Sequence, residues 1–241
     1  MSKKIAAYTG TRNLYPHMVP AVKSLLYSSD VDEVWLFIED DDFPAAPVKL
    51  PPMVKVRNVS GQTYFPPDGP NMRSRYTYMA MMRAVYADLF PDADRVLSLD
   101  VDTICKADIS DLWDLPIDDY YFAASVEPDR TKDEGRMYTN IGVCLYNLAK
   151  LRDGKWREVV AALNRQRYRN LEQDVFNFLC QGAIYDMPSE YNKTDFTRRC
   201  EAGKIIHYAG KRFWHNRPQY MRFEQMGWPE VMEHRWQTYR K

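Results

Sequence analysis

Two carboxylates lie at the end of an apolar run, in the stretch Leu97-Ser-Leu-Asp-Val-Asp-Thr-Ile104. In extended backbone Asp100 and Asp102 point to one face, about 7 Å apart. A carboxylate buried without a partner costs several kcal/mol or takes up a proton. A divalent cation supplies the missing charge, and hard oxygen ligands favour Mn²⁺ or Mg²⁺. The spacing therefore predicts a metal site at the carboxyl end of a strand, where open α/β sheets bind ligands.

Two other interpretations fit the same residues. In a turn, Asp102 would cap a helix or accept hydrogen bonds from local N–H groups, without a metal. A phosphatase of the haloacid dehalogenase type has a strand followed by Asp-x-Asp-x-Thr/Val, whose first Asp is a nucleophile. Here Thr103 comes one place too early, Ile104 stands in the Thr position, and the strand is far from the N-terminus. The sequence disfavours the phosphatase and leaves the turn open.

Strand-like and helix-like patterns alternate along the chain, which is typical of an α/β sheet with crossover helices. Apolar runs predict strands at 4–9, 34–38, 54–59, 95–99, 120–126, 141–146 and 205–208. Helical spacing of apolar residues predicts helices at 15–27, 76–90, 156–163 and 172–179, the second with a core-facing stripe of Met and aromatic residues. The Pro-rich passages 43–52 and 65–70 predict loops, because proline interrupts both periodicities.

Composition narrows the classes of partner. The chain has 33 Lys and Arg against 33 Asp and Glu, so no global field favours nucleic acid or an anionic membrane. No run approaches the roughly 18 apolar residues of a membrane span, and the N-terminal apolar stretch is too short for a signal peptide. We therefore expect one cytoplasmic domain. The cysteines lack a Cys-x-x-Cys arrangement, which predicts unpaired thiols in a reducing compartment. They are Cys105, Cys144, Cys180 and Cys200.

Four segments occur in an order and spacing that is much more specific than any one alone. They are Arg83 to Ile104 with its Asp-x-Asp pair, Thr139-Asn-Ile-Gly-Val-Cys-Leu-Tyr-Asn-Leu148, Glu172-Gln-Asp-Val-Phe-Asn177 and Ile206-His-Tyr-Ala-Gly-Lys-Arg-Phe-Trp214. In these segments the chain resembles glycosyltransferase family 8, the retaining enzymes that include glycogenin and bacterial lipopolysaccharide galactosyl- and glucosyltransferases. The resemblance runs from the first strand to about Trp214.

The resemblance implies a GT-A fold, a Rossmann-like single α/β domain with a mixed, mainly parallel sheet and flanking helices. That domain would span 1–241, with 215–241 as a helical, aromatic extension. It also implies transfer of a hexose from a nucleotide sugar, UDP-glucose or UDP-galactose, to a carbohydrate, lipid-linked or protein acceptor that stays open. The metal, Mn²⁺ with Mg²⁺ as the alternative, would be held by Asp100, Asp102 and His207. As a Lewis acid it would assist the departing diphosphate.

The resemblance further assigns the residues around the donor. Glu172 and Gln173 would be catalytic, beside the donor sugar, with Gln173 near the β face of the anomeric carbon. Without the family, His207 would be a packed core histidine and Arg83 part of a solvated helix face. The implied substrate-binding residues are Thr9, Asn13, Tyr15, Arg83, Asp100, Val101, Asn140, Gly142, Gly210 and Lys211, where glycine permits close approach and lysine supplies a point charge.

Retention needs either a nucleophile on the β face or same-face attack with the leaving phosphate as base. A neutral amide is a poor nucleophile, so Gln173 favours same-face attack. Two departures from the family affect specificity. The loop 8–15 lacks the acid that contacts the base, and Glu172 stands where the family usually has Asp.

The remaining features have two interpretations each. The basic residues Arg198, Arg199, Lys204, Lys211, Arg212 and Arg217 would neutralise the nucleotide or form a solvated surface. The aromatic residues Trp214, Tyr220, Trp228 and Trp236 would stack on sugar or, as we favour, pack against the domain. The alternative function is a non-catalytic module of the same fold that binds a sugar nucleotide or carbohydrate. The complete set Asp100, Asp102 and His207 argues for the enzyme.

Overall fold

The computed structural model of the chain describes residues 3–40 and 50–239. Of the predicted loop 43–52, residues 43–49 lie outside the described residues. The predicted loop 65–70 is confirmed, because it contains neither helix nor strand. Among the described residues, no helix is both long enough and apolar enough to cross a membrane.

Within the described residues, seven strands form one sheet in the order β3-β2-β1-β4-β7-β6-β8. Only β7 runs antiparallel to its neighbours in this sheet, so the expected mixed, mainly parallel sheet is confirmed. A separate antiparallel pair is formed by β5 and β9. The strands are β1 (Ile5–Thr11), β2 (Glu33–Glu39), β3 (Val54–Asn58), β4 (Arg95–Leu99), β5 (Thr103–Cys105), β6 (Phe122–Val126), β7 (Thr139–Asn147), β8 (Ile184–Asp186) and β9 (Ile205–His207).

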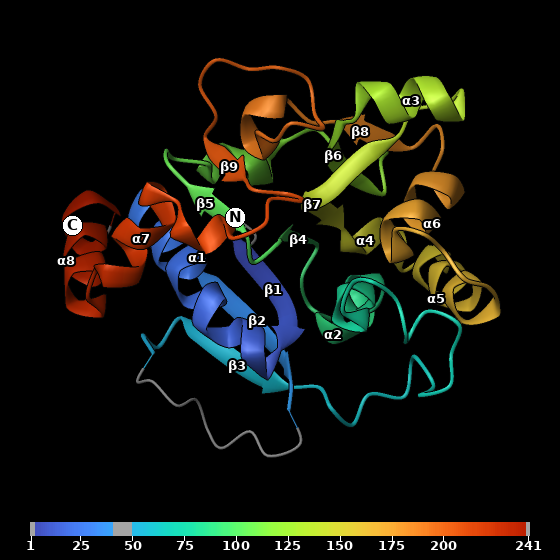
Figure 1. Cartoon of the computed structure of the whole chain (residues 1–241), viewed down its shortest axis with the longest axis horizontal. Coiled ribbons are helices and arrows are strands. Elements are labelled where there is room, and N and C mark those ends of the chain that lie inside the picture. Colours follow the sequence, from blue (N-terminus) through green and yellow to red (C-terminus); the bar gives the residue numbers. More distant parts are fainter. Residues whose placement is uncertain (1–2, 41–49, 240–241) are drawn as a thin grey trace.

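Helices flank the sheet on both faces (Figure 1). The α-helices are α1 (Tyr15–Ser28), α2 (Tyr86–Leu89), α3 (Pro128–Glu134), α4 (Leu148–Leu151), α5 (Lys155–Arg165), α6 (Leu171–Leu179), α7 (Pro218–Gln225) and α8 (Trp228–Tyr239). The 3₁₀ helices are η1 (Arg12–Leu14), η2 (Tyr78–Val85), η3 (Ser110–Asp114), η4 (Ser189–Asn192) and η5 (Trp214–Asn216).

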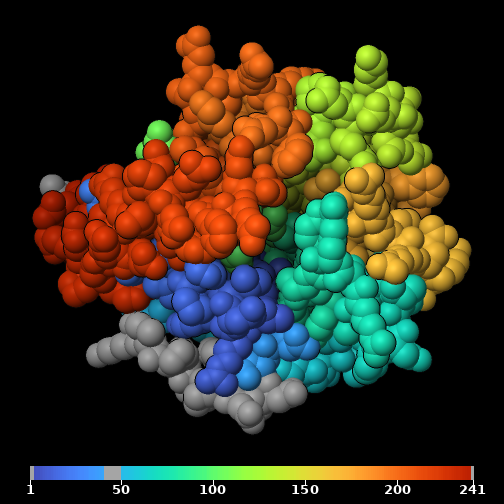
Figure 2. Space-filling model, viewed as in Figure 1, coloured from blue at the N-terminus to red at the C-terminus, as the bar shows by residue number. Residues whose placement is uncertain are grey.

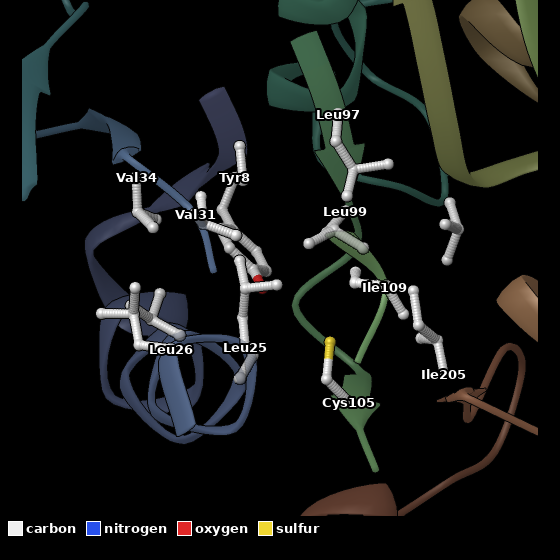
Figure 3. Close-up of a cluster of buried hydrophobic side chains, with 14 of the residues drawn as sticks. Tyr8, Leu25, Leu26, Val31, Val34, Leu97, Leu99, Cys105, Ile109 and Ile205 are labelled. Carbon is white, nitrogen blue, oxygen red and sulfur yellow. The ribbon is translucent and has the colours of Figure 1, made fainter. Parts of the chain in front are cut away.

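Side chains of β1 alternate between two hydrophobic clusters, one on each face of the sheet. Ala6 and Tyr8 belong to the cluster that includes α1, whereas Ile5 and Ala7 belong to the cluster that includes η2, α5 and α6. Figure 3 shows the first cluster, where Leu25 and Leu26 of α1 lie beside Tyr8. A sheet covered on both faces needs apolar residues at successive positions, which explains the near-continuous apolar strands of the sequence.

Most predicted elements are confirmed, and the differences concern short or irregular segments. The predicted helix 76–90 is irregular, because η2 precedes the short α2. Its Met stripe is buried as expected, with Met79, Met81 and Met82 in the core. Several short elements were not predicted, among them β5, β8, α3 and α4. Segments of three to seven residues show too little of either periodicity to be recognised.

The C-terminal helices α7 and α8 pack on α1, at the left of Figure 1. The attachment is polar as well as apolar. Buried Lys23 of α1 donates to Met226 O at 2.5 Å. Arg235 of α8 is fully enclosed and donates to Ser29 O at 2.8 Å and to Val31 O at 2.5 Å. These contacts fasten the tail to the second half of α1 and to the residues that follow it, and a buried guanidinium requires such partners.

Candidate active site

The site lies at one edge of the sheet, where several strand ends meet. Strands β4 and β6 are parallel and β7 lies antiparallel between them, so the carboxyl ends of β4 and β6 adjoin the start of β7. These ends deliver Asp100, Glu127 and Asn140. A cleft of about 480 Å³ opens at this edge. Figure 2 shows the hollow where blue, teal and orange-red segments meet, with green segments at its floor.

The backbone of the Asp-x-Asp pair forms a tight turn. Strand β4 ends at Leu99, and Thr103 donates to Asp100 O through both its N–H, at 3.2 Å, and its Oγ1, at 2.7 Å. The prediction of extended backbone at the pair was wrong, because the backbone forms a turn here, and this part of the alternative interpretation is correct. The turn leads into β5, where Thr103 is paired with His207 of β9. It therefore brings both aspartates next to the histidine.

The three predicted metal ligands converge. His207 Nε2 lies 3.5 Å from Asp100 Oδ2 and 3.4 Å from Asp102 Oδ1. One ligand atom of each residue lies within 4.8 Å of the others. On the other side of the ring, His207 Nδ1 lies 2.9 Å from Asn192 Oδ1, while Asn192 Nδ2 donates to Asn140 O. The amide oxygen accepts, so Nδ1 carries the hydrogen and Nε2 can present its lone pair to a cation.

The charges of this cluster fit a cation. Burial lowers the pKa of His207, but Asp102 and Asp100 outweigh it and raise the pKa to about 10. Burial also opposes ionisation of Asp100, yet the Arg83 guanidinium and His207 hold its pKa below its ordinary value. The site thus stabilises a positive charge between its two carboxylates. Without a metal, a proton on His207 Nε2 supplies this charge, and a bound cation would take the place of that proton. Oxygen and imidazole ligands with this charge suit Mn²⁺.

Only a glycine fits at position 142, because there is no space for a side chain beside the metal cluster. A Cβ at this position would overlap His207 Cε1 and stand 2.7 Å from Asp100 Oδ2. The backbone also contributes, because Asp100 N donates to Gly142 O at 2.7 Å. Any side chain here would displace a predicted ligand, so the glycine acts by close approach to the cluster.

Arg83 links the cluster to the second acidic group of the cleft. It is 7% exposed, so the interpretation as a solvated helix face is wrong. Its Nη2 forms an ion pair with Asp100, and its Nη1 lies 3.4 Å from Glu172 Oε1 and donates to Ile141 O at 3.2 Å. One buried guanidinium therefore compensates two carboxylates of the cleft.

Glu172 is 3% exposed and lines the cleft. Burial raises its pKa to about 7, although Arg83 opposes the shift. Its Oε2 is buried and has no hydrogen-bond partner among the described residues. A buried polar atom without a partner costs about 1–3 kcal/mol. A hydroxyl group of a bound ligand would satisfy this oxygen.

Gln173 also lines the cleft, but its amide is held by the protein. Its Oε1 accepts from Ile141 N at 3.2 Å, and its Nε2 donates to Tyr138 OH at 3.1 Å. The tyrosine hydroxyl in turn donates to Asp174 Oδ1 at 2.5 Å. These bonds fix the orientation of the amide at the wall of the cleft.

The structure brings together most of the predicted substrate-binding residues. Thr9, Val101, Asn140 and Gly210 line the same cleft as the metal cluster. Gly210 has φ +69°, a left-handed conformation that favours glycine.

Four predicted residues do not line the cleft. Gly142 lies beside the metal cluster instead, against His207 and Asp100. Asn13 is exposed and accepts from Thr11 Oγ1. Tyr15 is buried in the hydrophobic core at the start of α1. Lys211 follows Gly210, but its ammonium group forms an ion pair with Asp195. Their roles toward a donor stay predictions.

None of the six basic residues named from the sequence lines the cleft among the residues described. Three of them form ion pairs with surface carboxylates, namely Arg198 with Asp186, Lys204 with Asp111 and Glu190, and Lys211 with Asp195. The solvated-surface interpretation fits them better.

The tail aromatics mainly pack, as favoured. Tyr220 is buried and Trp228 packs against the core. Trp214 has its ring centroid 5.0 Å from that of Tyr220 and lines the cleft as well. Trp236 is 62% exposed.

Sequence reasoning missed two buried polar residues of the site. Glu127 lines the cleft and accepts from Asn140 Nδ2 at 2.7 Å, and burial raises its pKa. It directly follows the apolar strand β6, the same signal that revealed Asp100, so it could have been found. Asn192, which orients His207, lies in the short helix η4, and no sequence pattern marks it.

Comparisons with known proteins agree with this geometry. The profile of glycosyl transferase family 8 matches residues 39–217. The chain belongs to glycosyl transferase family 8. This membership confirms the resemblance and leaves the phosphatase interpretation without support.

Two curated relatives match about half of this family 8 chain. A lipopolysaccharide 1,2-glucosyltransferase of Escherichia coli is 33% identical over 149 residues, which are 54% of this chain and 44% of the relative. A putative glycosyltransferase of Haemophilus influenzae is 28% identical over 153 residues, which are 52% of this chain and 45% of the relative. The matched region thus spans less than half of either relative.

Solved structures show the fold. The galactosyltransferase LgtC, in complex with donor and acceptor sugar analogues, superposes with a TM-score of 0.68 at 19% identity, over 95% of this chain and 99% of LgtC. The bifunctional glycosyltransferase WbbM gives a TM-score of 0.71 at 16% identity, over 97% of this chain and 51% of WbbM. The expected GT-A fold is confirmed.

Proposed function

We propose that this family 8 chain is a retaining glycosyltransferase that moves a hexose from a UDP-sugar to an acceptor and depends on Mn²⁺. UDP-glucose and UDP-galactose are the donors we favour. The observation that carries the proposal is the convergence of Asp100, Asp102 and His207 in one cleft with the Arg83–Glu172 pair.

The metal cluster would bind the diphosphate end of the donor. Asp100, Asp102 and the Nε2 atom of His207 would hold the cation, and Asn192 would keep the ring in the required tautomer. The cation, when bound, supplies Lewis acidity to the departing diphosphate. Arg83 keeps Asp100 ionised at the pH of the reaction, because it lowers the pKa of that carboxyl.

The other end of the cleft would bind the donor sugar. The partnerless Oε2 of Glu172 would accept a hydrogen bond from a sugar hydroxyl. Asn140 and Glu127 lie on the neighbouring strand ends and offer further polar atoms. The amide of Gln173, fixed by Ile141 and Tyr138, gives this wall a constant shape.

We favour same-face attack for the retention of configuration. The amide of Gln173 is neutral and a poor nucleophile. In same-face attack, the acceptor oxygen bonds to the anomeric carbon as the bond to the phosphate oxygen breaks. The proton of the acceptor hydroxyl then passes to the leaving phosphate.

The four free cysteines are consistent with our proposal of a cytoplasmic location, where thiols stay reduced.

Hydrolysis of a panel of nucleotide sugars tests the proposal, since it needs no acceptor. We expect slow, Mn²⁺-dependent release of UDP from one or both favoured donors. Binding of UDP without any hydrolysis would instead support a non-catalytic binding module. If the chain neither binds nor hydrolyses any nucleotide sugar, both functions are refuted.

A further inference from the structure

Two arginine-rich segments, 72–76 and 165–170, lie side by side at the mouth of the cleft. Asn71 joins them from beneath, because its buried Nδ2 donates to Leu163 O at 2.6 Å and to Gln166 O at 2.8 Å. Its Oδ1 accepts from Tyr168 N at 2.9 Å. The two segments are therefore held in one fixed arrangement, although they are far apart in the sequence.

Their side chains add further links between the segments. Arg75 Nη2 donates to Asn170 Oδ1 at 3.1 Å, and Arg167 Nη2 donates to Arg73 O at 3.5 Å. These partners are neutral, so they orient the guanidinium groups without cancelling their charge.

The segments gather five exposed arginines, which we call the arginine surface: Arg73, Arg75, Arg165, Arg167 and Arg169. Across residues 3–40 and 50–239, none of the five forms an ion pair with a carboxylate, whereas many other arginines do. The whole chain has a formal net charge of zero, so this accumulation is local. Uncompensated like charges repel, and an anion at this surface would relieve the repulsion.

The arginine surface adjoins the part of the cleft that we assign to the donor sugar. Arg75 and Arg169 line the cleft. Asn170, the partner of Arg75, leads directly into α6 and its residues Glu172 and Gln173. An acceptor hydroxyl must reach the anomeric carbon, so a group beside the donor sugar is also beside the acceptor.

The extent of the surface exceeds the donor. Arg73, Arg165 and Arg167 lie outside the lining of the cleft, where a nucleotide sugar bound to the metal cluster would not extend. Two exposed aromatic side chains, Tyr76 at 46% and Phe196 at 50%, line the mouth of the cleft and offer apolar faces for a sugar ring.

We infer that the arginine surface binds phosphate or carboxylate groups of an acceptor saccharide while the donor occupies the cleft. The inference rests on the proposed function, because only a glycosyltransferase has an acceptor. Guanidinium groups suit this role, because their paired N–H donors match both phosphate and carboxylate oxygens.

Calorimetric titration of the full chain tests the inference with defined probes. The anionic probes are phosphorylated mannopentaose and trigalacturonic acid, and the neutral counterparts are mannopentaose and maltotriose. Comparison of the two anionic probes distinguishes phosphate from carboxylate. Vesicles containing phosphatidylglycerol provide an arm for membrane binding.

The variant to test combines Arg75→Gln with Arg169→Gln. The matched control combines Arg57→Gln with Arg199→Gln. It removes two exposed arginines that, within the described part of the chain, neither form ion pairs nor line the cleft. Thermal unfolding of each variant establishes that it is folded.

We expect at least one anionic saccharide to bind with about tenfold or higher affinity than its neutral counterpart. This affinity should decrease with added salt. The Arg75/Arg169 variant should lose about tenfold or more of that affinity, and the control should lose less than twofold. Equal binding of neutral and anionic saccharides, unchanged affinity in the variant, or binding to vesicles alone would overturn the inference.

Titration of UDP with Mn²⁺ on the same samples separates this inference from the proposed function. If UDP binds but no anionic saccharide does, the inference fails and the function stands. If an anionic saccharide binds but no nucleotide does, the acceptor role is overturned together with the proposed function.

Discussion

Charged side chains are paired at the floor of the cleft and lack charged partners at its mouth, within the described part of the chain. At the floor, Arg83 contacts Asp100 and Glu172, and His207 contacts both aspartates of the turn. At the mouth, the five residues of the arginine surface have no carboxylate partner among the residues described. Burial explains the contrast, because a buried charge must be compensated within the protein, whereas water compensates an exposed one.

The contrast teaches which charges hold the fold and which are available to a ligand. Floor residues should affect both stability and turnover when they are replaced. Mouth residues should affect binding of an anion and leave stability almost unchanged.

Replacement of Arg83 should give the largest effect. In Arg83→Met, the carboxylates of Asp100 and Glu172 lose their shared cation, and removal of one partner from a buried pair costs about 3–5 kcal/mol. The free energy of unfolding in urea, with a chelator present, measures this loss. The control Arg136→Met removes an exposed pair with Glu134 and should cost less than about 1 kcal/mol. Equal losses in the two variants would remove the distinction between buried and exposed pairs.

Asp102→Asn should retain the fold and lose turnover. The amide keeps the shape of the turn but removes one charge from the metal cluster, so Mn²⁺-dependent donor hydrolysis should fall on the order of 10²- to 10³-fold. Asp68→Asn, at an exposed loop position, is the control and should hydrolyse donor at the wild-type rate. Unchanged hydrolysis in Asp102→Asn would refute the metal cluster as the catalytic centre.

The raised pKa of Glu172 predicts a pH dependence of stability. Between about pH 4.5 and 7 the folded protein keeps this proton while the unfolded chain loses it, so the unfolded state binds fewer protons. Stability should therefore fall as the pH rises through this window, by about 3 kcal/mol, and then level off. The variant Glu172→Gln lacks this titrating group. The unfolding free energy of the wild type minus that of the variant, measured without metal, should therefore fall over this pH window. Parallel pH profiles would contradict the prediction.

Replacement of one arginine at the mouth should give the smallest effect. Arg165→Gln and Arg167→Gln should each change the free energy of unfolding by less than about 0.5 kcal/mol. Both side chains are exposed, and neither forms an ion pair with any residue that the structure describes. Thermal and urea unfolding measure this difference. A loss above 2 kcal/mol in either variant would show that the arginine surface supports the fold.

Much of the fold and the floor could be predicted from the sequence, for a physical reason. A carboxylate after an apolar strand is costly enough to be noticed, which is how Asp100 and Asp102 were found. The same reasoning applies to Glu127 after β6. The turn at Asp100 could not be distinguished from extended backbone, since three residues carry no periodicity. The family resemblance, and not spacing, supplied His207.

The remaining parts depend on contacts between distant segments. Asn192 acts only because η4 lies against β9. The arginine surface exists because Asn71 holds the segments 72–76 and 165–170 together. Arginines in two separate polar stretches look like ordinary solvated residues until that contact is known.

The central claim is a cation-dependent donor site built from Asp100, Asp102 and His207. Calorimetric titration of UDP tests this claim most directly. The wild-type chain should bind UDP with Mn²⁺ and lose most of this affinity in a chelator, and Asp102→Asn should bind poorly in both. Equal affinity for UDP with Mn²⁺ and with chelator in the wild-type chain would contradict the account.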